Sequence, residues 1–171
     1  QYKEALDAYQ KAYKLAADNW EPVFRIGVVQ YKLQQLPESV ASLQKAVERN
    51  STDRWVYNAL GYSALANNQL DIAYEAWVHA RDMVPNEPVY YYNIAMIHGK
   101  KKEWTKALEL CQKTISLDSS YMDAYNLAAE SYYQSGDYGQ AQKYWSQVLE
   151  KNPQDKNALD GLSRLKAQKK K

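Results

Sequence analysis

Residues 54–87 read RWVYNALGYSALANNQLDIAYEAWVHARDMVPNE, and this stretch decides the fold because its spacing recurs along the chain. Ala73 in its middle is followed by Ala107 and Ala141 at steps of 34 residues. The same step aligns a pair of positions that hold, in successive copies, Ile26 with Gly27, Leu60 with Gly61, Ile94 with Ala95, and Ala128 with Ala129. A fixed period of this length is typical of a stacked helical repeat.

Side-chain size stays nearly constant in three further columns of the repeat. The first column is small throughout: Ala5, Ser39, Ala73, Ala107 and Ala141. The second is large or apolar: Tyr9, Leu43, Trp77, Cys111 and Trp145. The third stays small: Ala12, Ala46, Ala80, Thr114 and Val148. Small residues let the two helices of a hairpin approach closely, and the large ones fill the space beside that contact. The pattern therefore predicts antiparallel helix pairs.

Within residues 54–87 the large, small and proline order resembles the tetratricopeptide repeat (TPR) family, through Tyr57, Leu60, Gly61, Ala73, Trp77, Ala80 and Pro85. The resemblance covers nearly the whole chain. It implies an all-α fold, a right-handed α-solenoid of antiparallel helix pairs known as the TPR superhelix. No stretch of the chain has the pattern of a strand.

The period divides the chain into helical units. We expect a single TPR domain over residues 1–171, in which residues 2–19 are the second helix of a truncated repeat. Full repeats are expected at 20–53, 54–87, 88–121 and 122–155, and a C-terminal capping helix at 156–171. The incomplete first repeat suggests an N-terminus trimmed from a longer protein. The last unit keeps Leu159 and Leu162 but places polar residues where a neighbour would otherwise pack, which is typical of a solvating cap.

Composition bounds the partners. The 22 Lys and Arg against 20 Asp and Glu give no general attraction to nucleic acid or to an anionic membrane. No apolar run is long enough to span a bilayer, so no membrane insertion is expected. No signal peptide is visible, and the compartment stays open: the cytoplasm is favoured, with the periplasm or another compartment possible if a leader was removed.

The residues that usually perform chemistry do not form a recognisable site. Cys111 shares its column with Leu43, Trp77 and Trp145, so we interpret it as a buried small hydrophobe. His79 and His98 lie in different repeats, and neither has a cysteine or carboxylate partner at metal-ligand spacing. The sequence therefore predicts no catalytic residue, no metal site and no cofactor, and the protein is expected not to be an enzyme.

The resemblance implies that the first helix of each pair lines a concave groove. The residues expected to bind a partner there are Phe24, Val28, Trp55, Asn58, Tyr62, Tyr92, Met96, Asn126 and Glu130. One column of this groove holds Val28, Tyr62 and Met96 and then Glu130 and Arg164, so an apolar half is expected to give way to a charged half. Asn58 and Asn126 each carry an amide that can bond to an extended peptide backbone.

These features favour a non-enzymatic scaffold or adaptor for protein–protein interaction, which binds a peptide segment or helix of a partner protein in the groove. The acidic C-terminal tail of a chaperone is disfavoured as the ligand, because no alignment of the repeats supplies the cations that two carboxylates require. Two alternatives remain. The apolar face of residues 2–16 can mediate self-assembly into a homo-oligomer, or the chain can be the recruitment domain of a larger multidomain enzyme.

Overall fold

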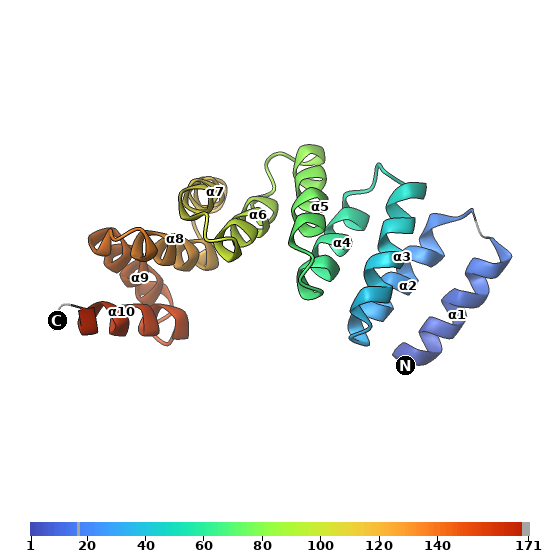
Figure 1. Cartoon of the computed structure of the whole chain (residues 1–171), viewed down its shortest axis with the longest axis horizontal. Coiled ribbons are helices and arrows are strands. Elements are labelled where there is room, and N and C mark those ends of the chain that lie inside the picture. Colours follow the sequence, from blue (N-terminus) through green and yellow to red (C-terminus); the bar gives the residue numbers. More distant parts are fainter. Residues whose placement is uncertain (17, 169–171) are drawn as a thin grey trace. The chain divides into compact units, whose positions relative to one another are not determined.

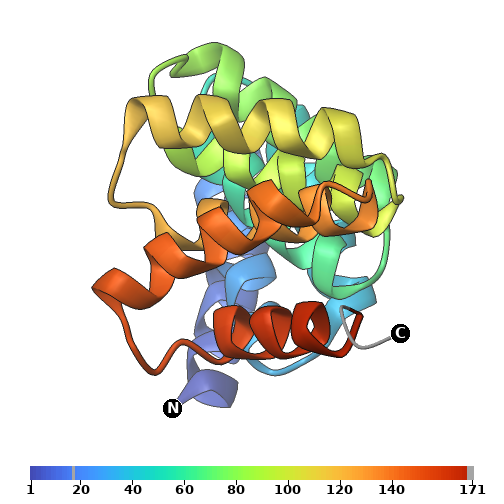
Figure 2. The ribbon, with the colours of Figure 1, turned by 90° about the vertical axis from the view of Figure 1, so that its left-hand side faces the viewer.

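The computed structural model describes residues 1–16 and 18–168, and within these ranges all regular structure is α-helical (Figures 1 and 2). The expectation of an all-α fold is confirmed. The helices are α1 (Tyr2–Leu15), α2 (Trp20–Lys32), α3 (Leu36–Arg49), α4 (Arg54–Ala66), α5 (Leu70–Met83), α6 (Pro88–Lys100), α7 (Trp104–Leu117), α8 (Met122–Gln134), α9 (Tyr138–Lys151) and α10 (Lys156–Gln168).

The chain divides into two compact units, Gln1–Pro85 and Asn86–Lys171. In the first unit α2 pairs with α3 and α4 with α5, and α3 packs against α4. In the second unit α6 pairs with α7 and α8 with α9, while α7 packs against α8 and α9 against α10. Each unit is therefore built from helical hairpins that bury their apolar faces against one another. The organisation of residues 1–171 as a single domain stays a prediction.

The first helix of each hairpin begins at the residue that the period indicates. Trp20, Arg54, Pro88, Met122 and Lys156 are the first residues of α2, α4, α6, α8 and α10. Side-chain caps define three of these starts. The carboxamide of Asn19 accepts from the backbone N–H of Glu21 at 3.0 Å, the carboxylate of Asp53 from that of Trp55 at 2.8 Å, and the carboxylate of Asp155 from that of Ala158 at 2.9 Å. Such caps satisfy N–H groups that have no partner within the helix.

A left-handed residue lies in the middle of the three-residue connection inside each complete hairpin. Gln34, Asn68, Lys102 and Gly136 have φ angles of 60°, 58°, 59° and 85°, and they too lie 34 residues apart. This conformation lets the chain reverse within three or four residues. Only one of the four is a glycine, so the other three hold a conformation that side chains normally avoid.

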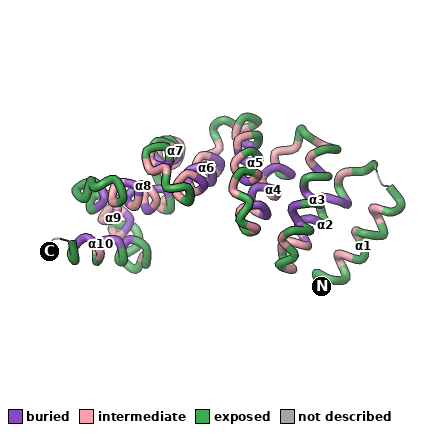
Figure 3. The backbone as a smooth tube through the Cα atoms, viewed as in Figure 1, coloured by how far each residue is buried: buried purple, intermediate pink, exposed green. Residues whose placement is uncertain are grey.

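The columns of constant side-chain size form the core. In the complete repeats their members are all buried, whereas Ala5, Tyr9 and Ala12 of α1 are only half-buried. Figure 3 shows this difference as the absence of fully buried positions along α1. Ser39 is the one serine in the column of alanines, and its buried hydroxyl has hydrogen-bond partners. It donates to the carbonyl of Gly27 at 2.7 Å and lies 2.9 Å from the hydroxyl of Ser63.

Glycines mark the closest approaches of helices to tryptophan rings. A Cβ atom at Gly61 would lie 2.5 Å from the ring of Trp77, and one at Gly161 would overlap the ring of Trp145. In α10 the buried residues are Ala158, Gly161 and Leu165. Leu159, which the sequence suggested as a packing residue, is 47% exposed, so that interpretation is wrong. The face of α10 is set by the contact with Trp145, which places Leu159 on the solvent side.

Candidate functional site

The first unit contains a hollow formed by the first helices of its two complete hairpins. Its volume is 370 Å³, and its lining comes from α2 and α4: Phe24, Val28, Tyr31, Trp55, Asn58, Ala59, Tyr62 and Ser63. No charged side chain contributes to this lining. The five residues that the sequence suggested for this part of the chain, Phe24, Val28, Trp55, Asn58 and Tyr62, are thus brought together in one place.

Aromatic side chains form half of the lining of the α2–α4 hollow. Trp55 is 56% exposed although it is the largest side chain there, and the guanidinium of Arg54 lies 4.6 Å from the centre of its ring. Tyr62 meets the buried Trp77 edge to face, with ring centres 5.3 Å apart and an angle of 80° between the rings. Packing against Trp77 fixes the Tyr62 ring, so the wall is preorganised for an apolar ligand.

Asn58 has a structural partner that sequence reasoning missed. Its side-chain carbonyl accepts a hydrogen bond from the indole N–H of Trp77 at 3.2 Å. This hydrogen bond occupies one of the two acceptor positions of the Oδ1 atom, so the carbonyl end of the amide is already partly engaged. The Nδ2 group is left to donate to a peptide carbonyl.

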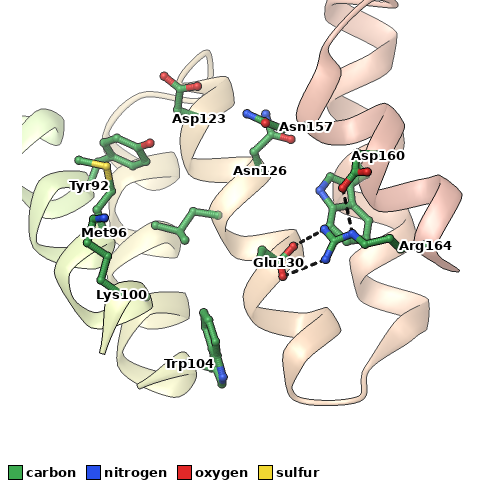
Figure 4. Close-up of a pocket in the computed structure, with 13 residues that line it drawn as sticks. Tyr92, Met96, Lys100, Trp104, Asp123, Asn126, Glu130, Asn157, Asp160 and Arg164 are labelled. Atoms are coloured by element: carbon green, nitrogen blue, oxygen red, sulfur yellow. Dashed lines mark hydrogen bonds and ion pairs between the residues drawn. The ribbon is translucent and has the colours of Figure 1, made fainter. Parts of the chain in front are cut away.

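The second unit contains a hollow of 440 Å³ between α6, α8 and α10, which Figure 4 shows in close-up. It includes the other four residues suggested by the sequence: Tyr92, Met96, Asn126 and Glu130. The rest of its lining is formed by Gly99, Lys100, Trp104, Asp123, Leu127, Trp145, Asn157, Asp160 and Arg164. This α6–α8 hollow therefore contains charged side chains of both signs beside an apolar wall.

Three of the five charged side chains in the α6–α8 hollow, Glu130, Asp160 and Arg164, interact with one another. The Arg164 guanidinium donates from Nη1 to Oε1 of Glu130 at 3.2 Å and from Nη2 to Oε2, and its Nε lies 3.0 Å from Asp160 (Figure 4). Burial alone would raise the pKa of Glu130, but hydrogen bonds from Arg164 and Gln134 outweigh it and leave the pKa below its usual value. The carboxylate of Glu130 therefore links α8 to α10 and is not a free anion.

Asn126 is the most unusual polar group in this hollow. It is only 7% exposed, and its Nδ2 donates to Asp155 at 3.1 Å. Because a carboxylate can only accept, this contact fixes which end of the amide faces Asp155. The Oδ1 atom is then buried without a donor among the described residues. A buried acceptor without a partner costs free energy that a ligand N–H can recover.

Asn157 and Asp160 were missed as lining residues, although a signal for them was present. They occupy the same columns as Trp55 and Asn58, at the second and fifth positions of their helices. The interpretation of residues 156–171 as a cap gave no reason to expect groove residues there. Trp104 was missed for a different reason. It is the first residue of α7, the second helix of its hairpin, whereas the groove residues were sought only on the first helix of each hairpin.

His98 and Cys111 lie outside both hollows. The Nδ1 atom of His98 lies 2.8 Å from Glu103, a contact that the sequence did not indicate, because the turn between α6 and α7 brings together residues five apart in sequence. Hydrogen bonds from Lys106 and then His98 lower the pKa of Glu103. Cys111 is buried, and burial raises the pKa of its thiol to about 12. Among the described residues, no three His, Cys, Asp or Glu side chains gather at a possible metal site.

The helical hairpins and their period define the chain as a helical-repeat protein. Residues 28–159 match the family model described as "Cytochrome c-type biogenesis protein H TPR domain", and residues 1–54 match the model "Tetratricopeptide repeat". The chain therefore belongs to the tetratricopeptide repeat family, whose domains are in general non-enzymatic scaffolds for protein interaction. No helix within residues 1–16 and 18–168 has the length and apolar character needed to cross a bilayer.

Individual relatives cover the chain to different extents. It is 29% identical over 104 residues to small glutamine-rich tetratricopeptide repeat-containing protein 2 of Saccharomyces cerevisiae, covering 61% of this chain and 30% of that protein. It is 26% identical over 137 residues to the BBSome complex member BBS4 of Bos taurus, covering 80% of this chain and 26% of that protein. The chain thus spans about a third or less of the length of these curated relatives.

Solved structures share the fold. MamA matches with a TM-score of 0.84 and 26% identity, over 89% of each chain. YrrB, described as a TPR protein with an unusual peptide-binding site, matches with a TM-score of 0.87 over 95% of this chain and 84% of its own. Its identity of 18% supports a common fold only.

Proposed function

We propose that this protein is a non-enzymatic scaffold that holds peptide segments or helices of a partner protein against the first helices of its repeats. The observation that carries the proposal is the position of the nine groove residues suggested by the sequence: five line the α2–α4 hollow and four line the α6–α8 hollow. Exposed aromatic side chains are favourable anchors at interfaces, because covering them buries much apolar surface at a low entropic cost.

The two hollows suit different parts of a ligand. The α2–α4 hollow has an apolar wall with one amide donor, at Asn58, and fits an aromatic or aliphatic side chain beside a backbone carbonyl. The α6–α8 hollow combines the apolar surface of Met96 and Leu127 with charged groups, and fits a mixed sequence. Neither hollow requires a cofactor for this role, and nucleic acid is not the partner that we propose.

The test is a selection of displayed random peptides on the purified protein, followed by fluorescence anisotropy with labelled synthetic copies of the selected peptides. Tyr62→Ala and Met96→Ala are measured singly and together, with Tyr138→Ala and Met83→Ala as controls on exposed tyrosine and methionine residues outside the two hollows. We expect the double variant to bind at least about tenfold more weakly, as for anchor residues at other interfaces. Binding at full strength by the folded double variant would refute the proposal.

Self-assembly through α1 is a second candidate with its own observation. No residue of α1 is buried, and Leu15 and Tyr2 are 89% and 53% exposed. Light scattering coupled to size exclusion decides this case. A mass that rises with protein concentration in the wild type but not in Leu15→Glu supports self-assembly, and a constant monomer mass excludes it. A role as the recruitment domain of an enzyme stays a prediction that the reading frame of a longer protein would test.

A further inference from the structure

We infer that the α6–α8 hollow selects a peptide segment with a basic side chain next to an apolar one, and that Asp123 and Asn126 of α8 recognise the basic end. The inference rests on the proposed function and specifies the chemistry of the partner. It concerns the end of the hollow at which α8 begins, where Figure 4 shows Asp123 and Asn126 on one side and Tyr92 and Met96 of α6 on the other.

The carboxylates of the lining outnumber its cations. Its carboxylates are Asp123, Glu130 and Asp160, and its cations are Lys100 and Arg164. Arg164 is bound to Glu130 and lies within ion-pair distance of Asp160, so these three groups neutralise one another in part. Asp123 is exposed, and no cation within residues 1–16 and 18–168 pairs with it. A carboxylate in this situation attracts a cation from solution or from a ligand.

Asn126 supplies the independent observation. It lies three residues after Asp123, so both side chains project from the same face of α8. Its buried Oδ1 lacks a donor, while its Nδ2 is committed to Asp155. This end of the hollow thus combines an exposed carboxylate with a buried neutral acceptor that has no donor, three residues further along the same helix. Lysine and arginine carry only donors in their polar groups, and arginine can reach two acceptors at once.

The apolar wall beside the acceptors determines what accompanies the basic residue. Tyr92 packs against Tyr121 with ring centres 5.1 Å apart, and Met96 and Leu127 continue the lining. An unbranched methionine adapts its shape to an aliphatic or aromatic neighbour. The fitting segment therefore carries a lysine or arginine next to a leucine-like residue. An acidic segment is disfavoured at this end, because Asp123 would repel it and the orphaned acceptor would stay unpaired.

The experiment compares random peptides selected on the wild-type protein, on Asp123→Lys and on Glu150→Lys. The last variant changes net charge by the same amount at an exposed position of α9 outside the hollow. We expect lysine or arginine to be enriched at one fixed position on the wild-type protein and on Glu150→Lys, and to be lost or replaced by aspartate or glutamate on Asp123→Lys. For one selected basic peptide, Asp123→Asn and Asn126→Leu should each weaken binding about tenfold at low salt.

The outcomes separate this inference from the proposed function. If selected peptides need Met96 but show no basic preference, or if Asp123→Lys leaves their charge unchanged, the inference is wrong and the scaffold function stands. If no peptide binds in a manner that depends on Tyr62 or Met96, both are wrong. Rising salt should reduce the binding of basic peptides and leave that of uncharged ones unchanged, because screening acts on the contact with Asp123.

Discussion

Arg164 of α10 forms a bidentate hydrogen bond with Glu130 of α8, and the two residues stand 34 positions apart in the same column of the repeat. In the earlier repeats this column holds Val28, Tyr62 and Met96. The residues at this position in two successive repeats thus form an ion pair with each other. This hydrogen bond links α10 to α8, in addition to the packing of α10 against α9.

We predict that stability falls in acid through this pair. Because the pKa of Glu130 is lowered by folding, its contribution is present above the ordinary glutamate pKa of about 4.3 and is lost as the pH falls through the lower folded value. Urea denaturation of Glu130→Gln and wild type from pH 7 to pH 3 should show a difference of about 1 kcal/mol at neutral pH, since the pair is partly exposed. The difference should shrink toward pH 3. If the difference in the free energy of unfolding stayed constant with pH, the effect would come from packing and not from the charge of Glu130.

We predict opposite effects of two glycine-to-alanine changes. Gly61→Ala should destabilise the first unit by about 1–3 kcal/mol, because the new Cβ would lie 2.5 Å from the Trp77 ring. Gly139→Ala in α9 meets no atom closer than 3.7 Å and should stabilise by about 0.5–1 kcal/mol through helix propensity. Thermal unfolding followed by circular dichroism measures both. A stabilising Gly61→Ala would mean that the helix backbone shifts easily at this contact.

We predict that glycine is preferred where the hairpins turn. Gln34 has a φ of 60°, in a region that costs an ordinary residue about 1–2 kcal/mol. Glycine avoids this cost but gives the unfolded chain more entropy, so Gln34→Gly should stabilise the folded protein by a net of about 0.5–1 kcal/mol. Asn68 has nearly the same φ, 58°, but asparagine tolerates it. Asn68→Gly should therefore change the free energy of unfolding little, and equal gains at both positions would contradict this explanation.

We predict that Cys111 reacts only after unfolding. Its thiol is buried, and burial raises the pKa to about 12, so very little thiolate forms near neutral pH. Because folding raises this pKa, the stabilising contribution is complete below the ordinary thiol pKa, and it is lost as the pH rises from about 9 toward 12. Labelling with a chromogenic disulfide reagent at pH 8 should be at least a hundredfold slower in buffer than in 6 M guanidinium. Rapid labelling in buffer would show that this part of the second unit opens readily.

The periodic part of the structure could be predicted from the sequence, and the individual polar contacts could not. The spacing of Ala73, Ala107 and Ala141 was sufficient to locate helix starts such as Arg54, because a repeated packing contact leaves a repeated sequence. A column cannot show which neighbour a side chain meets. The bonds of Asn58 to Trp77 and of Asn126 to Asp155 depend on local side-chain geometry, which differs between copies.

The exposure of Trp55 makes the molecule its own optical reporter. Trp77 and Trp145 are 0% and 1% exposed and Trp20 and Trp104 are half-buried, while the indole of Trp55 meets solvent. Trp55, in the wall of the α2–α4 hollow, is thus the most exposed of the five tryptophans, and we expect it to emit at the longest wavelength and to be the one that iodide reaches best. A blue shift and a loss of iodide quenching on adding a ligand would register occupancy there without any dye, and the Trp55→Phe protein would be blind to the same event.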